Sequence, residues 1–439
     1  MAGAASAIPP RPAAAQIGSP AGPVPVERLA ARRAALFESL GTGIAILRSS
    51  EARSIERDYP QDSDYRESND FFYLTGLESP GSWLVLAARD SGPDEAILFL
   101  PPADAAVERW TGRAGLPPTE ATRLTGITDV RSARGAEEEI WSLVFGGGSP
   151  ARAGSLFIRR DSAQAESAFF RRLVFSAGGH GQPVAVSDLG APLARLRLVK
   201  DAEEIRRLRQ AATITADALR DAMASARPGM HEYELEARIE YGFRRGGAER
   251  VGFPSIVGSG PNGTALHYDR NRRRTRQGDL VVMDVGAEFG YLTADVTRTI
   301  PITGRFTDRQ RALYRLVLGA QEAALAQVAP GVTLPVLDRV ARSYIRERSG
   351  SLCGASSCDR YFVHGLSHWL GMDVHDVGSY ATPLAPGMVF TVEPGIYLPE
   401  EGLGIRIEDD VLVTQTGYEL LSGAAPRAAE EVERAMSPR

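Results

Sequence analysis

The pattern of apolar and polar positions divides the chain into two parts. In the first part a helix is predicted at 27–40, followed by short apolar runs with the length and composition of β-strands. These strands are predicted at 42–47, 82–88, 95–100 and 155–158. Clusters of Gly, Ser and Pro at 147–154 and 174–190 interrupt the pattern. We therefore expect residues 27–190 to form a separate N-terminal α/β domain.

The second part, residues 191–439, repeats one arrangement: a helix, a Pro-Gly turn, a second helix and a β-hairpin. Its first helix opens with a capping box formed by Asp201 and Glu204, and its third with Thr307 and Gln310. Apolar residues at helical spacing follow both boxes: Ile205, Leu208, Ala212 and Leu219, then Leu313, Leu316, Val317 and Ala320. Mixed helices and hairpins in this order predict an α+β domain.

Three pairs of segments in this part match one another in the same order. The longest pair is Gly278-Asp-Leu-Val-Val-Met-Asp284-Val-Gly286 and Gly387-Met-Val-Phe-Thr-Val-Glu393-Pro-Gly395. A second pair aligns His267 with His375, and a third aligns two Pro-Gly turns, with offsets of 109, 108 and 102 residues for the three pairs. We infer a duplicated unit whose halves each bring a histidine and an acid to one centre.

The first hairpin places two carboxylates together. Leu280–Val285 and Tyr291–Ile300 predict two strands around Phe289-Gly290, and a turn on those two residues sets Asp284 directly opposite Asp295. Carboxylates so close repel unless a cation lies between them or one takes a proton. Asp284 ends an apolar run, where a lone charge is costly. We therefore prefer a metal site to a pair of solvated acids.

The second copy supplies further donors. Glu393 and Glu408 come from neighbouring strands, and alternation places Arg406 on the same face as Glu408. His364 and His368 are four residues apart, but the glycine between them argues against a helical zinc pair. Five candidate metal ligands result: Asp284, Asp295, His368, Glu393 and Glu408.

Composition limits the class of partner. With 439 residues, 43% hydrophobic and 24% charged, and a net charge of −5, the chain is typical of a soluble globular protein without a nucleic-acid or anionic-membrane surface. No apolar run reaches the length of a membrane span. We interpret the arginine-rich run 270–276 as a solvated loop. Residues 1–26, rich in Ala, Pro and Gly, lack the features of a signal peptide and predict a disordered arm.

Cys353 and Cys358 are the only two cysteines of the sequence. Their spacing allows a small disulfide loop, which is typical of an oxidising compartment, and it equally fits two free thiols. We expect a cytoplasmic protein. The alternative is a periplasmic or secreted one, if a signal peptide was removed and the two cysteines are bridged.

The ordered motifs resemble those of the proline-specific pita-bread metallopeptidases, family M24, of the Xaa-Pro aminopeptidase (aminopeptidase P) type. In the second part they are Leu266-His267-Tyr268, Met283–Gly286, Thr293–Thr299, His364–Asp376, Thr391–Gly395 and Gly404–Asp410. Arg66–Gly76 and Glu108–Arg113 resemble the family's N-terminal domain. The resemblance covers nearly the whole chain. It implies an α/β domain followed by a pseudo-twofold duplicated α+β pita-bread catalytic domain.

The resemblance also implies a site with two divalent ions, most commonly Mn²⁺, with Zn²⁺ or Co²⁺ as alternatives. Asp284 would bind one ion, Asp295 and Glu408 would bridge both, and His368 and Glu393 would complete the set. Oxygen-rich ligands with one imidazole suit Mn²⁺ better than a closed structural zinc site.

By the same resemblance, several residues of these motifs would act on the substrate. Glu393 is the candidate for accepting the proton of the attacking water. His267 and His375 are candidates for holding the scissile carbonyl and stabilising the oxyanion. His364 and Arg406 would line the proline pocket and position the neighbouring acid, Glu408.

The implied activity is release of the N-terminal residue from peptides with proline in second position, by a homodimer or homotetramer. A prolidase, which cleaves Xaa-Pro dipeptides at the same kind of site, is the nearest alternative. A methionine aminopeptidase would usually lack the N-terminal domain. A binding scaffold without catalysis is a more distant alternative, against which the five intact ligand positions argue.

Overall fold

The computed structural model describes residues 20–51, 65–111, 115–147, 149–160, 166–179 and 183–437. The described residues form two compact units, one within 22–196 and one at 197–437, and residues 20 and 21 belong to the second. Most of the predicted N-terminal arm, residues 1–19, lies outside the described residues. Among the described helices, none is long and apolar enough to cross a membrane.

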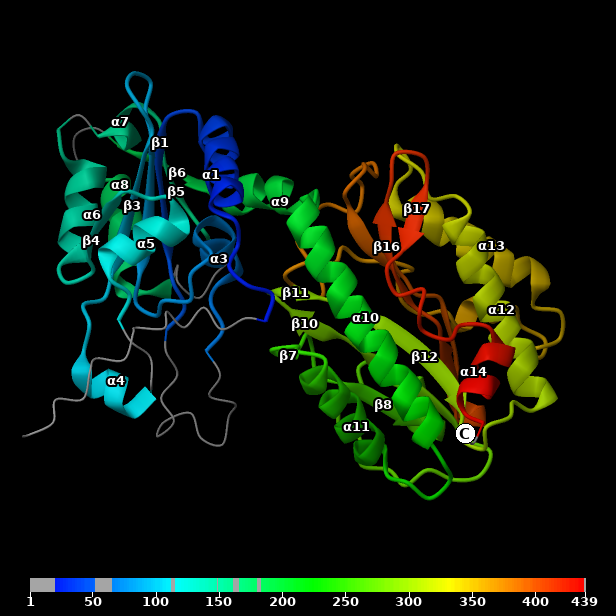
Figure 1. Ribbon diagram of the computed structural model, residues 1–439. Helices are drawn as coiled ribbons and strands as arrows, with labels where there is room; N and C mark the ends of the chain where they lie inside the picture. Colours follow the sequence, from blue (N-terminus) through cyan, green and yellow to red (C-terminus); the bar gives the residue numbers. More distant parts are fainter. Residues whose placement is uncertain are drawn as a thin grey trace, which may run out of the picture. The chain divides into compact units, whose positions relative to one another are not determined.

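The first unit is built on one six-stranded sheet with the order β4-β3-β2-β1-β5-β6 (Figure 1). Its strands are β1 Gly43–Arg48, β2 Trp83–Ala88, β3 Glu95–Leu100, β4 Asp129–Ser132, β5 Ser155–Ile158 and β6 Ala185–Asp188. Strands β1, β2 and β3 are antiparallel, whereas β4, β5 and β6 run parallel to their neighbours. Four of the six strands are those predicted from apolar runs. The other two, β4 and β6, are short and partly polar, so they carry no such signal.

Helices cover this sheet, and aromatic packing holds one face. The helices in this part of the chain are α1 Val26–Leu40, α3 Asn69–Thr75, α4 Ala105–Thr111, α5 Pro118–Thr125, α6 Ala136–Phe145, α7 Pro150–Ala153, α8 Ala168–Ala177 and α9 Gly190–Leu198, of which α4 and α9 lie away from the sheet (Figure 1). Trp83 of β2 meets Phe169 and Phe170 of α8 with ring centroids 5.3 and 5.8 Å apart. The same buried cluster includes Ile140 of α6. Burying aromatic rings of this size is a large part of what stabilises the unit.

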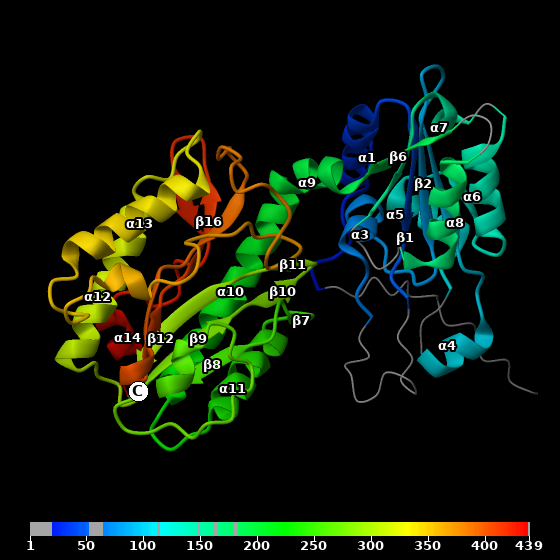
Figure 2. The ribbon, with the colours of Figure 1, turned by 180° about the vertical axis from the view of Figure 1, so that it is seen from behind.

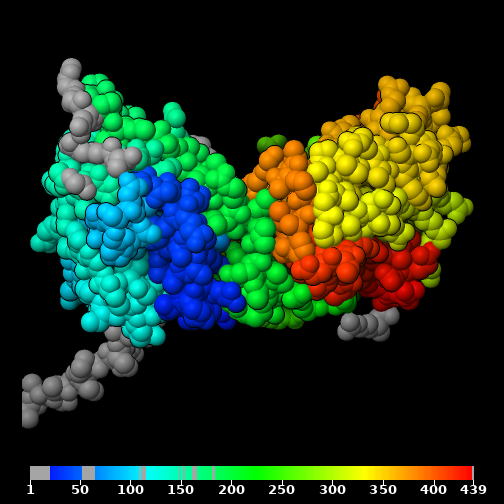
Figure 3. Space-filling view, turned by 90° about the horizontal axis from the view of Figure 1, so that it is seen from above, coloured from blue at the N-terminus to red at the C-terminus, as the bar shows by residue number. Residues whose placement is uncertain are grey.

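Two helix pairs flank the strands of the second unit (Figures 1 and 2). The pairs are α10 Ala202–Ser225 with α11 Glu232–Arg245, and α12 Asp308–Leu325 with α13 Leu334–Arg348. Both predicted capping boxes are formed, by Asp201 with Glu204 and by Thr307 with Gln310. In the space-filling view the yellow residues, which include α13, form a continuous surface with the orange and red residues that follow (Figure 3).

Short strands and turns lie between the helix pairs. The strands are β7 Arg250–Val251, β8 Ile256–Ser259, β9 Leu280–Val285, β10 Ala287–Phe289, β11 Leu292–Thr293, β12 Val296–Pro301, β13 Val389–Val392, β14 Gly395–Leu398, β15 Leu403–Arg406, β16 Asp409–Val413 and β17 Tyr418–Leu420. Short 3₁₀ turns and a last helix complete the unit: η2 Gly260–Thr264, η3 Cys358–Tyr361, η4 Pro399–Glu401 and α14 Ala429–Ala435. The sheets are β12-β9-β8, β11-β10-β7, β13-β16-β17 and β14-β15.

The backbone contains matching turns in the two halves of the second unit, as the predicted duplication requires. The glycines of the two Pro-Gly turns, Gly229 and Gly331, have φ angles of 91° and 92°. Each donates its N–H to a carbonyl in the segment that leads to the next strand, Thr275 at 3.0 Å in the first copy and Leu384 at 2.8 Å in the second. Because only glycine adopts this φ without strain, the matched glycines mark equivalent turns. The two halves of the second unit therefore contain the equivalent turns that the predicted duplication requires.

The predicted register of the first hairpin was wrong by two residues. The turn falls on Gly290 and Tyr291, both with positive φ, and Asp284 pairs with Thr297 rather than with Asp295. Tyrosine rarely adopts positive φ, which is why the sequence pointed to the preceding pair. A shift by two keeps the same residues on the same face, so Asp284 and Asp295 become diagonal neighbours on one side of the hairpin.

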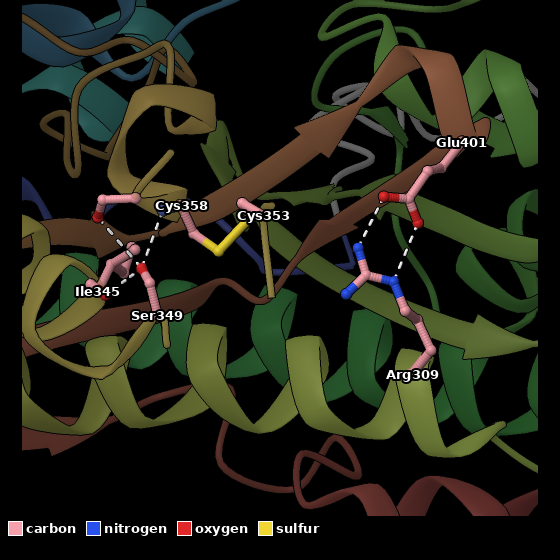
Figure 4. Close-up of a disulfide and its surroundings, with 7 residues drawn as sticks. Arg309, Ile345, Ser349, Cys353, Cys358 and Glu401 are labelled. Atoms are coloured by element: carbon pink, nitrogen blue, oxygen red, sulfur yellow. Dashed lines mark hydrogen bonds and ion pairs between the residues drawn. A yellow bond between two sulfur atoms is a disulfide. The ribbon is translucent and has the colours of Figure 1, made fainter. Parts of the chain in front are cut away.

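The two cysteines form a disulfide that joins Cys353, in the turn after α13, to Cys358 at the start of η3. Figure 4 shows the bridge beside Ser349, whose hydroxyl accepts a hydrogen bond from the N–H of Cys358 and donates one to the carbonyl of Ile345. Of the two alternatives that the spacing left open, the structure therefore contains the bridged one.

Candidate metal centre

Three of the predicted ligands form a tight buried group. Nε2 of His368 lies 3.3 Å from Oδ2 of Asp295 and 3.9 Å from Oε1 of Glu408. One donor atom from each of the three lies within 4.8 Å of the others, and all three residues are buried. Two acids and an imidazole this close could hold a metal ion.

The other two predicted ligands border this group. Oε1 of Glu393 lies 3.5 Å from Nε2 of His368. Asp284 is close enough to Asp295 to raise the pKa of that acid, and its Oδ2 accepts a hydrogen bond from Arg406 at 2.6 Å. The structure thus brings all five candidates to one place.

The electrostatics of this group favour a cation. Burial raises the pKa of Asp295 and Glu408 well above the ordinary range, and repulsion between these acids and Glu393 raises it further. Burial also raises the pKa of Glu393 to about 7, although His368 and Arg406 oppose the shift. Within the described residues, Oδ1 of Asp284 and Oδ1 of Asp295 are buried without a hydrogen-bond partner. A buried carboxylate oxygen without a hydrogen-bond partner destabilises the fold unless a positive charge lies beside it. The donor set therefore fits divalent metal ions.

Hydrogen bonds donated by the backbone N–H groups of three of the acids hold the donors in place. The N–H of Glu408, between β15 and β16, donates to the carbonyl of Thr297 in β12 at 3.1 Å. The N–H of Glu393, directly after β13, donates to the carbonyl of Leu366 at 2.9 Å. The N–H of Asp295 donates to the buried carboxylate of Asp410 at 3.1 Å. Each acid is therefore anchored through a segment of the chain distant from its own.

Arg406 connects the acids to a polar wall of the site, which is formed by Arg406, Tyr397 and His364. Besides Asp284, its guanidinium donates to the hydroxyls of Thr297 and Tyr397, at 3.1 and 2.8 Å. Thr297 in turn donates to Oε2 of Glu408 at 2.6 Å. Arg406 therefore holds Asp284 directly and reaches Glu408 through a threonine hydroxyl.

His364 lies at the end of this wall. Its Nε2 is 2.8 Å from the hydroxyl of Tyr397, and its Nδ1 is 3.6 Å from Oε2 of Glu393. Burial and the neighbouring Arg406 lower the pKa of His364 to about 4. The imidazole is therefore neutral near pH 7 and can exchange hydrogen bonds without adding charge.

His267 and His375 lie at the exposed side of the group. Their ring centroids are 6.5 Å apart, and the ring of His375 packs edge-on against that of His368 at 4.3 Å. Partial desolvation, with the charges of His368 and His267, lowers the pKa of His375. Two imidazoles that border the group of candidate ligands are suited to donating hydrogen bonds to a developing oxyanion.

Several residues at the site had no sequence prediction. Tyr397 and Thr297 carry the Arg406 network, but an isolated hydroxyl in a strand has no pattern that marks it. Glu232, in the first turn of α11, is fully buried and accepts hydrogen bonds from Ser259 and from Tyr268, which follows His267. An acid in the first turn of a helix is common, so nothing in the sequence marked Glu232 as buried.

A fully buried ion pair lies behind Glu408. Arg298 of β12 donates to the carbonyl of Glu408 at 2.6 Å and pairs with Asp409 at 2.7 Å. Asp409 also accepts from Gln321 of α12 and from Ser422. Because every charge in this group has a partner, it can be buried without the penalty of an isolated ion, and it fixes the strand segment that presents Glu408.

Comparison with known proteins finds a family model for each unit. Residues 206–415 match Metallopeptidase family M24, and residues 29–148 match the Aminopeptidase P, N-terminal domain. Xaa-Pro aminopeptidase of Escherichia coli (strain K12) is 38% identical over 430 residues, covering 92% of this chain and 96% of that protein.

Solved structures agree with the sequence comparison. Proline aminopeptidase P II from Yersinia pestis is 32% identical with a TM-score of 0.86, covering 94% of this chain and 99% of that one. Zinc-substituted E. coli aminopeptidase P in complex with product is 33% identical with a TM-score of 0.85, over the same shares of the two chains.

Proposed function

Because the chain belongs to metallopeptidase family M24 and is an aminopeptidase that binds metal, we propose that it releases the N-terminal residue from peptides of the form Xaa-Pro-Yaa. We further propose that it uses two divalent ions, most commonly Mn²⁺, with Zn²⁺ or Co²⁺ as alternatives. The observation that supports this most is the convergence of four carboxylates and one imidazole, two of whose buried oxygens have no hydrogen-bond partner among the described residues.

The ions would be held by Asp284, Asp295, His368, Glu393 and Glu408, the ligand set that the family resemblance implies. Asp295, His368 and Glu408 support this most directly, because one donor atom of each lies within 4.8 Å of the others. Arg406 keeps Asp284 oriented toward the group. When bound, the ions supply positive charge and a water acidic enough to act as a nucleophile near neutral pH.

The protein's own groups would then move the proton and bind the developing charge. Glu393, whose pKa is raised to about 7 by burial, is suited to accepting the proton of the attacking water and passing it to the leaving proline nitrogen. His267 and His375 would donate hydrogen bonds to the scissile carbonyl oxygen as it gains charge. His267 and His375 are both exposed to solvent, so a substrate can reach them.

The wall formed by His364, Tyr397 and Arg406 would receive the proline ring. Its three polar groups are already hydrogen-bonded to one another, so the surface presented to the ring keeps few unsatisfied donors. A rigid proline ring loses little conformational entropy on binding to such a preformed wall.

The substrate class is tested with a matched pair of peptides. The loaded enzyme is expected to hydrolyse Ala-Pro-Ala at least about a hundredfold faster, as kcat/KM, than the dipeptide Ala-Pro. Ala-Ala-Ala serves as the control for the requirement for proline. Preference for the dipeptide would identify a prolidase, and equal rates for Ala-Pro-Ala and Ala-Ala-Ala would contradict proline specificity.

Metal removal is expected to lower stability. At a cation concentration about a hundredfold above Kd, binding adds about 2.7 kcal/mol to the free energy of unfolding. For a unit of this size the increase corresponds to a rise of about 5–10 °C in Tm when Mn²⁺ is added to chelator-treated protein. Differential scanning calorimetry measures the shift.

A variant separates repulsion from metal binding. Asp295→Asn removes one of the mutually repelling buried acids, so we expect its metal-free form to melt above the metal-free wild type and to respond little to Mn²⁺. An unchanged response of Asp295→Asn to Mn²⁺ would exclude this acid as a ligand.

A further inference from the structure

Three charged side chains are buried together beside the segment that carries His375. Nη2 of Arg197 lies 2.5 Å from Oδ1 of Asp376, and Nζ of Lys200 lies 3.0 Å from Oδ2. The side chains of Asp376, Lys200 and Arg197 are 0%, 1% and 3% exposed. Leaving one of these charges unpaired at such depth would be strongly destabilising, so the carboxylate and the two cations hold one another in place.

The surrounding backbone confines this cluster. The N–H of Asp376 donates to the carbonyl of Trp369 at 2.9 Å, and the N–H of Lys200 donates to the carbonyl of Gly387 at 2.9 Å. A Cβ at Gly371 would lie 2.0 Å from Oδ2 of Asp376, so the carboxylate fills the space that glycine leaves. The pKa of Asp376 is below its ordinary value, because the two cations outweigh the opposing effect of burial.

The adjacent His375 depends on this confinement. Residues 371–375 form no helix or strand, and His375 itself is exposed to solvent. Its ring has to stay between those of His368 and His267 to meet a carbonyl oxygen. Because only two side-chain torsions separate the imidazole from the main chain, the position of the ring depends on the position of the backbone of His375.

We propose that Asp376, held by Lys200 and Arg197, is a positioning residue that fixes the imidazole of His375 where it meets the substrate. The inference rests on the role given to His375 in the proposed function. Asp376 touches no reacting group and acts through the backbone of its neighbour. A displacement of about 1 Å in a catalytic group can lower a rate by about a hundredfold.

A purely structural tether makes a different prediction. Lys200 and Arg197 lie at the start of the second unit, so their pairing with Asp376 also fastens that part of the chain. If fastening were the whole role, loss of the carboxylate would lower Tm and leave the turnover of each folded, metal-loaded molecule unchanged. Turnover, metal content and Tm therefore have to be measured on the same sample.

The test uses Asp376→Asn with Asp373→Asn as its matched control. Asp373 pairs with the same arginine at 3.0 Å, but its side chain is 49% exposed. We expect Asp376→Asn to lower kcat by about tenfold to a hundredfold, with KM within about threefold of wild type and unchanged metal content. Asp373→Asn should change kcat by less than about twofold.

A double-mutant cycle with His375→Ala decides between the two explanations. If Asp376 acts through the imidazole, Asp376→Asn should lower kcat/KM by less than about twofold in the His375→Ala background. A loss as large as in the wild-type background overturns the inference, as does wild-type turnover of Asp376→Asn. If His375→Ala itself keeps wild-type turnover, the proposed role of His375 fails and the positioning role fails with it.

A second variant covers the case in which Asp376→Asn does not fold. Lys200→Met removes one cation and keeps the pair of Arg197 with Asp376. It should lower kcat by about threefold to tenfold at constant metal content, again with less than about a twofold effect in the His375→Ala background. An equal effect in both backgrounds contradicts the inference.

Discussion

Asp295→Ala is expected to abolish both metal binding and peptide hydrolysis. Asp295 lies against His368 and next to Asp284, and one of its buried oxygens has no hydrogen-bond partner among the described residues. Its removal takes a donor from the centre of the group. We expect kcat to fall by about a thousandfold or more, the equivalent of several kcal/mol of transition-state stabilisation, and Glu408→Ala to behave in the same way.

Elemental analysis and turnover of the same preparation check this result. Glu401→Ala is the matched control, because it also removes a carboxylate from the second unit but breaks only the exposed ion pair with Arg309 that is visible in Figure 4. Such a pair contributes little, so metal content and turnover should stay near wild type. If Asp295→Ala turned over substrate at the wild-type rate in the presence of a chelator, hydrolysis would not depend on this metal site.

His267→Ala is expected to lower turnover while leaving the bound metal in place. Its ring lies at the exposed side of the group, 6.5 Å from that of His375, and outside the trio of closest donors. Loss of one hydrogen-bond donor to an oxyanion typically lowers kcat by about a hundredfold to a thousandfold. We expect that loss with unchanged metal content.

His231→Ala controls for the loss of a surface imidazole from the same unit. His231 stacks on Tyr233 with a centroid distance of 4.9 Å at the start of α11, and its removal should leave kcat and metal content unchanged. Equal losses of metal and activity in His267→Ala would instead make His267 a ligand.

The sequence allowed the candidate ligands to be named because the duplication preserves spacing. Asp284 near the end of β9 and Glu393 directly after β13 occupy the same step of the same apolar strand in each copy. Gly278 and Gly387, which begin these repeats, both have a φ of 91°. A local pattern of this kind can be read from one chain, since it depends only on strand period and turn chemistry.

Other features could not be read in this way because they depend on tertiary contacts. Lys200 and Asp376 are 176 residues apart, and neither belongs to a motif that predicts the other. The hairpin register depended on Tyr291 adopting positive φ, against its intrinsic preference. Tyr397 is one hydroxyl in a short strand, and only the folded chain sets it between His364 and Arg406.

The distribution of the donors along the chain bears on how the enzyme matures. The set begins with Asp284 and is complete only when Glu408 has been added and β16 has paired with β13. A growing chain therefore cannot present the full set of donors until its C-terminal strands have been made and have paired. Metal loading is then a late event, open to whichever divalent ion the surrounding compartment supplies at that moment.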